Sequence, residues 1–144
     1  MERNTPIIYV LMFLVFFQAA SGLYGGGALI WDPSGTILEM PLELLHPSPF
    51  SDYLLLGVIL LIVLGIYPVI VFYSLYKRHL WAETGALILS LALIVWIGVE
   101  IIMIGYHTSP PLQLIYGLLG FVMLILSIIS MATTSVNSNK QDYD

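Results

Sequence analysis

Four long apolar stretches are the feature that most constrains the fold of this chain. They cover about residues 5–23, 49–76, 84–106 and 110–133. A helix needs about 20 apolar residues to cross the hydrocarbon core of a bilayer, and each stretch reaches or approaches that length. Because lipid offers no hydrogen-bond partners to an exposed backbone, all four stretches are predicted to be membrane-spanning helices.

The composition supports this prediction. Hydrophobic residues make up 59% of the 144 residues and charged residues 9%, whereas soluble domains carry about 25% charged residues. A small soluble domain leaves too much surface exposed to cover so much apolar material. The predicted fold class is therefore an all-α membrane protein: one four-helix transmembrane domain over residues 1–134, followed by a polar, frayed cytoplasmic tail over residues 135–144.

The same composition excludes several kinds of partner and site. The net charge is −5, and the 4 basic residues are not clustered, so nucleic acid is not an expected partner. The chain has no Cys, which excludes disulfides and metal–thiolate sites. We expect no cofactor, and membrane lipids are the first expected partners.

The basic residues predict how the chain is oriented. Arg3 precedes the first stretch, Lys77 and Arg78 lie between the second and third, and Lys140 follows the fourth. Since Lys and Arg in short loops stay on the cytoplasmic side, both termini are predicted to be cytoplasmic in a multi-pass protein of the cell membrane. One alternative stays open: Ala19-Ala20-Ser21 resembles a signal-peptidase site, and cleavage there would leave three spans.

Residues 24–48 then form an extracytoplasmic loop. Residues 28–31 and 36–39 are short β-prone runs on either side of the turn sequence Asp32-Pro33-Ser34-Gly35, a pattern that predicts a β-hairpin. Residues 41–46 have the apolar side expected of a short interfacial helix.

Other residues predict where helices end or bend. Gly25, Gly26 and Gly27 predict a flexible exit from the first helix. Ser48-Pro49 and Ser109-Pro110 each combine an N-cap residue with proline at the first helical position, and so predict the starts of helices two and four. Pro68 predicts a kink in the second helix.

Glu100 is the main candidate for a functional side chain. A charged group near the centre of a membrane helix costs roughly 2.5–3.5 kcal/mol on insertion scales, so it should be protonated or paired. Gln18 lies at a similar depth, Trp96 one helical turn before, and His107 on the same stripe at the outer surface. We expect a hydrogen bond between Glu100 and Gln18 to which the Trp96 indole contributes. The interpretation as a structural clasp between helices is favoured over a proton or cation relay that starts at His107.

The outer loop supplies a second set of candidates, for contact with a partner: Trp31, Asp32, Glu39, Glu43 and His46. Glu43 and His46 have the i, i+3 spacing of carboxylate-bridged metal sites, but such sites need two such pairs and further carboxylates. A solvated acidic loop is the preferred interpretation, and no metal site is predicted.

Part of this pattern resembles a group of small, uncharacterised prokaryotic four-helix integral membrane proteins. The resemblance covers about residues 22–126 and departs from the group's pattern at Leu55-Leu56-Gly57, where a proline and glycine are common. It implies the four-helix topology and no chemistry. The residues that carry it are Gly26-Gly27-Ala28-Leu29-Ile30, Asp32-Pro33-Ser34-Gly35, Ser48-Pro49-Phe50, Asp52-Tyr53-Leu54, Trp96-Ile97, Val99-Glu100, Gln113 and Tyr116-Gly117.

Three hypotheses for function remain. The chain contains no nucleophile elbow or similar catalytic motif, so we favour a non-enzymatic accessory or partner-binding bundle, which contacts another membrane protein through its outer loop or helix faces. The alternatives are a small proton- or ion-coupled transporter that uses Glu100, and a lipid-modifying membrane enzyme.

Overall fold

The computed structural model describes residues 5–46, 48–105 and 112–141. Within these residues the secondary structure is helical. In chain order the elements are α1 (Thr5–Trp31), the 3-10 helix η1 (Leu42–Leu45), α2 (Leu54–Leu61), the π-helical turn η2 (Ile62–Ile66), α3 (Tyr67–Tyr76), α4 (Ala82–Ile104) and α5 (Leu112–Gln141). Because α2, η2 and α3 follow one another without a break, they form a single span.

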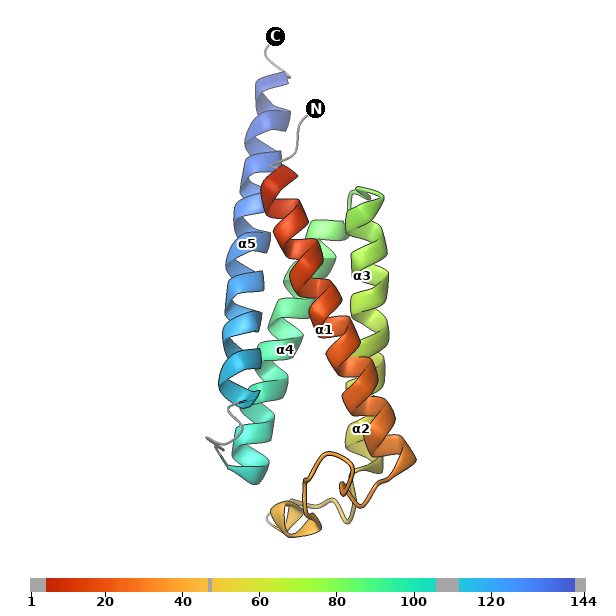
Figure 1. Cartoon of the computed structure of the whole chain (residues 1–144). Helices are drawn as coiled ribbons and strands as arrows, with labels where there is room; N and C mark the ends of the chain where they lie inside the picture. Colours follow the sequence, from red (N-terminus) through yellow and green to blue (C-terminus); the bar gives the residue numbers. More distant parts are fainter. Residues whose placement is uncertain (1–4, 47, 106–111, 142–144) are drawn as a thin grey trace.

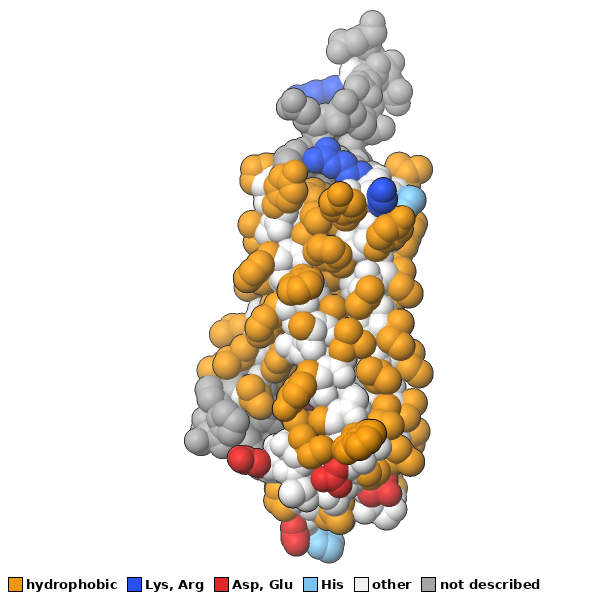
Figure 2. Space-filling view, turned by 45° about the vertical axis from the view of Figure 1, so that its right-hand side comes forward, with side chains coloured by type: hydrophobic (Ala, Val, Ile, Leu, Met, Phe, Trp, Pro, Cys, Tyr) orange, Lys and Arg blue, Asp and Glu red, His pale blue; other side chains and the backbone are white. Residues whose placement is uncertain are grey.

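Four helical segments are long and apolar enough to cross a membrane, as the sequence predicts. They are 26, 23, 22 and 25 residues long, which corresponds to about 33–39 Å at 1.5 Å per residue. Large hydrophobic side chains cover the outside of the bundle (Figure 2). A continuous apolar surface of this extent is unfavourable in water and matches a lipid surrounding.

The spans alternate in direction along the chain (Figure 1). The helix α1 is inclined across the bundle, so that its first half lies beside α5 and its last half beside α2. Helix α4 packs against both α3 and α5. We call the end that carries residues 32–53 the loop end, and the end that carries Lys77 and Arg78 the basic end.

The centre of the bundle is a dry layer of apolar side chains from three spans. Leu11 and Val15 of α1, Leu89 and Leu93 of α4 and Met123 of α5 are at most 1% exposed. They belong to one cluster of buried residues that continues toward the basic end. This layer matters for function because it separates the polar groups near the two ends of the bundle.

Glycines bring α1 unusually close to the second span. A Cβ on Gly22 would lie 1.8 Å from the Leu64 carbonyl oxygen, and one on Gly26 would lie 2.6 Å from the Leu61 backbone nitrogen. This Gly-x-x-x-Gly spacing allows backbones to approach in membrane helices. The prediction of a flexible exit at Gly25, Gly26 and Gly27 is wrong, because all three lie inside α1 and Gly26 packs against the backbone of the second span.

The predicted β-hairpin is also wrong, although its turn is present. Residues 28–31 continue α1, and residues 36–39 form a second turn instead of a strand. The first turn closes through Gly35 N–H to Asp32 O at 3.1 Å, with Gly35 at φ 79°. The Ser34 hydroxyl donates to Asp32 Oδ1, and this bond lowers the pKa of the Asp32 carboxyl.

A short helix is present where residues 41–46 predict one: the 3-10 helix η1, whose Leu45 is buried. The second span begins at Leu54, however, and Ser48 instead donates to the Leu45 carbonyl at 2.8 Å. Asp52 accepts a hydrogen bond from Leu54 N–H at 3.0 Å and so satisfies a free donor at the new start.

Two further expectations concern other helix ends. Ser109-Pro110 lies outside the described residues. At the other end of α5 the predicted frayed tail is instead helical as far as Gln141, because no proline or glycine interrupts the polar sequence after residue 133.

Candidate functional site

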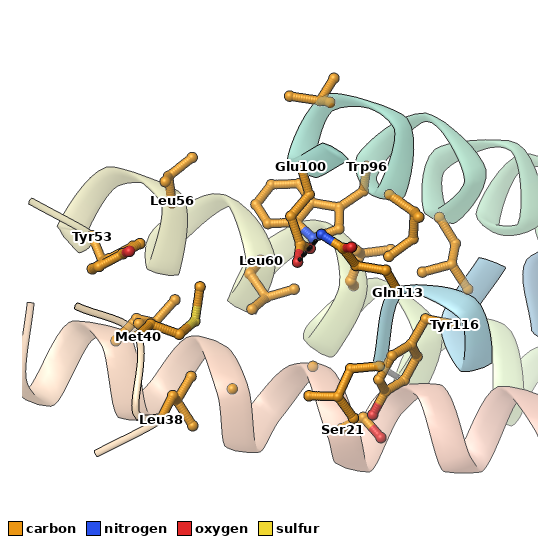
Figure 3. Close-up of a pocket in the computed structure, with 18 of the residues that line it drawn as sticks. Ser21, Leu38, Met40, Tyr53, Leu56, Leu60, Trp96, Glu100, Gln113 and Tyr116 are labelled. Atoms are coloured by element: carbon orange, nitrogen blue, oxygen red, sulfur yellow. Dashed lines mark hydrogen bonds between the residues drawn. The ribbon is translucent and has the colours of Figure 1, made fainter. Parts of the chain in front are cut away.

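A cavity of about 340 Å³ lies inside the loop-end half of the bundle. Its size falls within the range of roughly 300–1,000 Å³ that is typical of small-molecule sites. Helices α1, α2, α4 and α5 form its walls, and the loop residues Leu38, Met40 and Tyr53 cover it at the loop end (Figure 3). Most of the wall is apolar, with a few polar side chains that face the same space.

Part of the cavity wall consists of side chains of α1 and α5 that are also exposed at the surface of the bundle. Tyr24 of α1 and Leu112 of α5 both line it, and they are 67% and 51% exposed. Farther from the loop end, the rings of Phe17 and Tyr116 stack with centroids 6.1 Å apart and join the two helices.

Glu100 lines this cavity near the end of α4. Gln113, at the start of α5, donates through Nε2 to Glu100 Oε1 at 3.3 Å and to the Gly105 carbonyl at 3.0 Å (Figure 3). Gly105 ends α4 with φ 80°, a left-handed conformation that favours glycine. The buried Gln113 amide thus ties the end of α4 to the beginning of α5 and orients the carboxylate.

The expected hydrogen bond between Glu100 and Gln18 is not formed. Gln18 Nε2 instead donates to the Leu64 carbonyl at 3.2 Å. Pro68 lies four residues after Leu64 and has no N–H, so it cannot donate the usual helical bond to that carbonyl. The π-helical turn η2 lies immediately before this proline, and the partner of Gln18 follows from the same missing N–H.

The side-chain oxygen of Gln18 is a second polar atom of this site. Gln18 is 2% exposed, and its Oε1 has no hydrogen-bond partner among the described residues. An unpaired buried carbonyl oxygen costs about 1–3 kcal/mol. Since Gln18 lines the cavity, a ligand or water there could supply the missing donor.

The remaining predicted members of the polar site are only partly placed. Trp96 lies one turn before Glu100 on α4 and lines the same cavity (Figure 3). In the part of the chain that the structure describes, its indole makes no hydrogen bond, so the expected contribution of Trp96 to the clasp is not seen. His107 lies outside the described residues.

The loop that covers the cavity is fastened by Tyr53. This side chain is 1% exposed, and its hydroxyl donates to the Pro41 carbonyl at 2.9 Å. Burial raises the pKa of the Tyr53 phenol, and the negative charges of Glu43 and Glu100 raise it further. Tyr53 therefore remains neutral and hydrogen-bonded over the whole physiological range.

The outer-loop contact candidates do not join this site. Trp31, at the end of α1, is 85% exposed, and Glu39, Glu43 and His46 are exposed on the loop. Asp32 is held in its turn by Ser34. The cavity and the loop surface are thus two separate features of the loop end.

Two buried polar residues, Gln113 and Glu83, are not among the site residues that the sequence predicts. Gln113 was noted only as part of the family resemblance, and its position among apolar residues at the start of the fourth stretch was the available signal. Glu83 immediately precedes the third apolar stretch; its side chain is 5% exposed and accepts a hydrogen bond from Thr134 Oγ1 at 3.2 Å. Glu83 lies at the basic end, on the far side of the dry layer from Glu100.

The arrangement at the loop end can bind an apolar molecule and offer it hydrogen-bond acceptors. The dry layer of Leu11, Val15, Leu89, Leu93 and Met123 closes the bundle below it. Comparisons with family models, curated proteins and solved structures found no match to this chain. The resemblance to small prokaryotic four-helix membrane proteins therefore stays a prediction.

Proposed function

We propose that this chain is a non-enzymatic, multi-pass protein of the cell membrane that binds an apolar molecule from the surrounding lipid. The observation that carries the proposal is the mostly apolar cavity of about 340 Å³ in the loop-end half of the bundle, whose lining includes exposed side chains of α1 and α5. Ligand sites are typically concave and apolar, with a few polar groups that fix orientation. Glu100, Gln113 and Gln18 supply such groups here.

The proposed orientation places the basic end in the cytoplasm and the cavity in the outer half of the membrane. On the face that Figure 2 shows, exposed basic side chains gather at one end of the bundle and exposed acidic side chains at the other. Lys77 Nζ lies 6.0 Å from the Tyr73 ring centroid and 5.7 Å from that of Tyr76. Such aromatic and basic groups typically anchor a helix at the interface.

Single-cysteine labelling tests the orientation, because the chain has no native Cys. Glu43→Cys should react with a membrane-impermeant maleimide added to intact cells, and Lys77→Cys should react only after the cells are opened. The opposite pattern would reverse the orientation and place the cavity in the inner half of the membrane.

Filling the cavity tests the binding function. Leu60 lines the cavity, whereas its neighbour Ile59 is 37% exposed on the outside of the bundle. Leu60→Trp should displace any apolar molecule that co-purifies in mild detergent and is detected by mass spectrometry. Ile59→Trp is the matched control and should retain that molecule. If the wild type carries none, or if both variants retain it, the cavity is not the binding site.

A small proton- or ion-coupled transporter is a second candidate, favoured by the carboxylate of Glu100 at the cavity. Transport also requires a path to the other side of the membrane. Beside the dry layer, the described buried polar side chains are Ser90 and Ser127, and their hydroxyls donate to carbonyls of their own helices. The transport hypothesis therefore requires a second arrangement of the helices. Flux into liposomes that is unchanged by Glu100→Gln would exclude it.

A further inference from the structure

We propose that the ligand of this cavity is a neutral lipid alcohol, a molecule with an apolar body and a hydroxyl group that donates a hydrogen bond to Gln18 Oε1. This inference rests on the proposed function and specifies the chemical class of the ligand. It is carried by three properties of the described residues that line the cavity: their mostly apolar character, the unpaired oxygen of Gln18, and nearby hydroxyl groups whose hydrogens are already donated elsewhere.

The apolar character of the wall favours a neutral ligand. The described lining contains no basic side chain that would pair with an anionic group. Its acidic residue, Glu100, already interacts with Gln113, and the same amide joins the end of α4 to the start of α5. Moving a charged group into an apolar space carries a large desolvation cost. A neutral molecule avoids that cost.

The side-chain oxygen of Gln18 needs a hydrogen-bond donor. Gln18 is 2% exposed, and its Nε2 donates to the Leu64 carbonyl at 3.2 Å, whereas Oε1 has no hydrogen-bond partner in the described structure. Both Gln18 and Leu64 line the cavity, so the amide lies in its wall. The terminal torsion of a glutamine side chain is broad, which allows the amide to tilt toward a donor inside the cavity. An amide oxygen only accepts, so the ligand must bring the hydrogen.

Two hydroxyl groups of the wall do not supply this hydrogen. Ser21, three residues after Gln18 on α1, donates to the Phe17 carbonyl at 2.8 Å. Tyr53 donates to the Pro41 carbonyl at 2.9 Å. Each hydroxyl has a single hydrogen, and both hydrogens are used inside the protein.

The Trp96 indole favours a hydroxyl over a group that only donates. Trp96 lines the same cavity (Figure 3), and its indole makes no hydrogen bond in the described part of the chain. An indole N–H can only donate, whereas a hydroxyl both donates and accepts. A hydroxyl therefore suits a wall that presents an acceptor on α1 and a donor on α4. A plain hydrocarbon chain is the main competitor, since it would fill the cavity without using either group.

Two probes of the same length separate a hydrogen bond from apolar fit. Bromohexanol and bromoheptane, each with a terminal bromine, differ by a hydroxyl in place of a methyl group. Bromine quenches tryptophan fluorescence at short range, and the chain has three tryptophans. Replacing Trp31 and Trp81 by phenylalanine in the full chain leaves Trp96 as the reporter inside the cavity. A chain that keeps only the exposed Trp31 reports how much of each probe enters the detergent, dodecylmaltoside.

Bromohexanol should quench the Trp96-only chain saturably and bind about 3- to 10-fold more tightly than bromoheptane, the range expected for the net contribution of one hydrogen bond. Gln18→Leu in this chain removes the acceptor and should abolish the preference while leaving the affinity for bromoheptane unchanged. Ser127→Ala is the matched control. It removes another buried polar group, one that is not among the described residues that line the cavity, and should preserve the preference.

The outcomes distinguish the two proposals. Equal affinity for both probes, or a preference for bromohexanol that survives Gln18→Leu, would overturn the assignment of a lipid alcohol and leave the binding function standing. Saturable quenching by neither probe, in a Trp96-only chain that unfolds cooperatively, would remove the proposed function as well. A circular dichroism melt of each variant shows that a loss of binding is not a loss of fold.

Discussion

Replacing Gly22 by alanine tests the close approach of α1 to the second span. The added methyl would lie 1.8 Å from the Leu64 carbonyl oxygen, 2.3 Å from its carbon and 2.8 Å from the Gly65 nitrogen. All three are backbone atoms, so no side-chain rotation can relieve the contact. The two helices must separate, and the contacts along their interface must loosen.

Gly27 provides the matched control, because a Cβ there would meet nothing within 4 Å. Both glycines lie inside α1, so the gain in helix propensity on replacement by alanine, about 1 kcal/mol, is common to both variants. Overpacking typically costs about 1–3 kcal/mol. Gly22→Ala should therefore be about 1–3 kcal/mol less stable than Gly27→Ala, near the upper end because the obstacle is backbone.

Thermal unfolding in dodecylmaltoside, followed by far-UV circular dichroism, measures this difference. For a chain of this size each kcal/mol corresponds to about 2–4 °C in Tm, so several degrees should separate the two variants. Equal melting temperatures would refute the close packing at Gly22. The same substitution should also disturb the cavity, which Gly22 lines.

Three further predictions concern the polar groups around the cavity. Glu100→Gln should change stability little, since an amide oxygen also accepts from Gln113, whereas Glu100→Leu should cost roughly 0.6–2 kcal/mol in the same melts; equal effects would contradict the clasp. Tyr53→Phe should destabilise by about 1 kcal/mol through its lost hydrogen bond. Because the folded pKa of Tyr53 is raised above 10.0, its stabilising contribution is complete below pH 10 and is lost as the pH rises through the folded pKa. If the melting temperature of Tyr53→Phe decreases at alkaline pH as much as that of the wild type, another group causes the loss. Gln18→Leu removes the donor to the Leu64 carbonyl, which costs about 1–3 kcal/mol, but also removes the unpaired Oε1, which recovers a similar amount. The melting temperature should therefore change little, and a loss of many degrees would show that Oε1 is satisfied in the membrane protein.

Much of the fold could be predicted from the sequence. The four spans follow from the length of the apolar stretches, the turn at Asp32 from its Asp-Pro-Ser-Gly sequence, and η1 from the leucines of residues 42–45. These features depend on local chemistry and on the solvent, and both can be read residue by residue. The predictions were wrong where packing against a neighbouring helix overrides the local conformational preference of a residue.

Glycine shows this override most clearly. Three consecutive glycines normally favour a flexible segment, and this preference predicted the end of the first helix too early. In the folded chain Gly22 and Gly26 lie against the backbone of the second span, and the packing that only glycine permits stabilises the helix. The partner surface is some 40 residues away in sequence, so no local rule could supply it.

For the candidate site too, some features follow from the sequence and others only from the tertiary structure. The sequence alone determined that this chain belongs in lipid and that Glu100 must find a polar partner, because the cost of an isolated carboxylate in hydrocarbon depends only on its depth. Only the tertiary structure decided that Gln113 donates to Glu100, that Gln18 donates to the carbonyl left without its helical donor by Pro68, and that a cavity lies among α1, α2, α4 and α5. Partners and cavities are set by how far and at what angle helices cross, and those quantities arise from all the contacts of the bundle together.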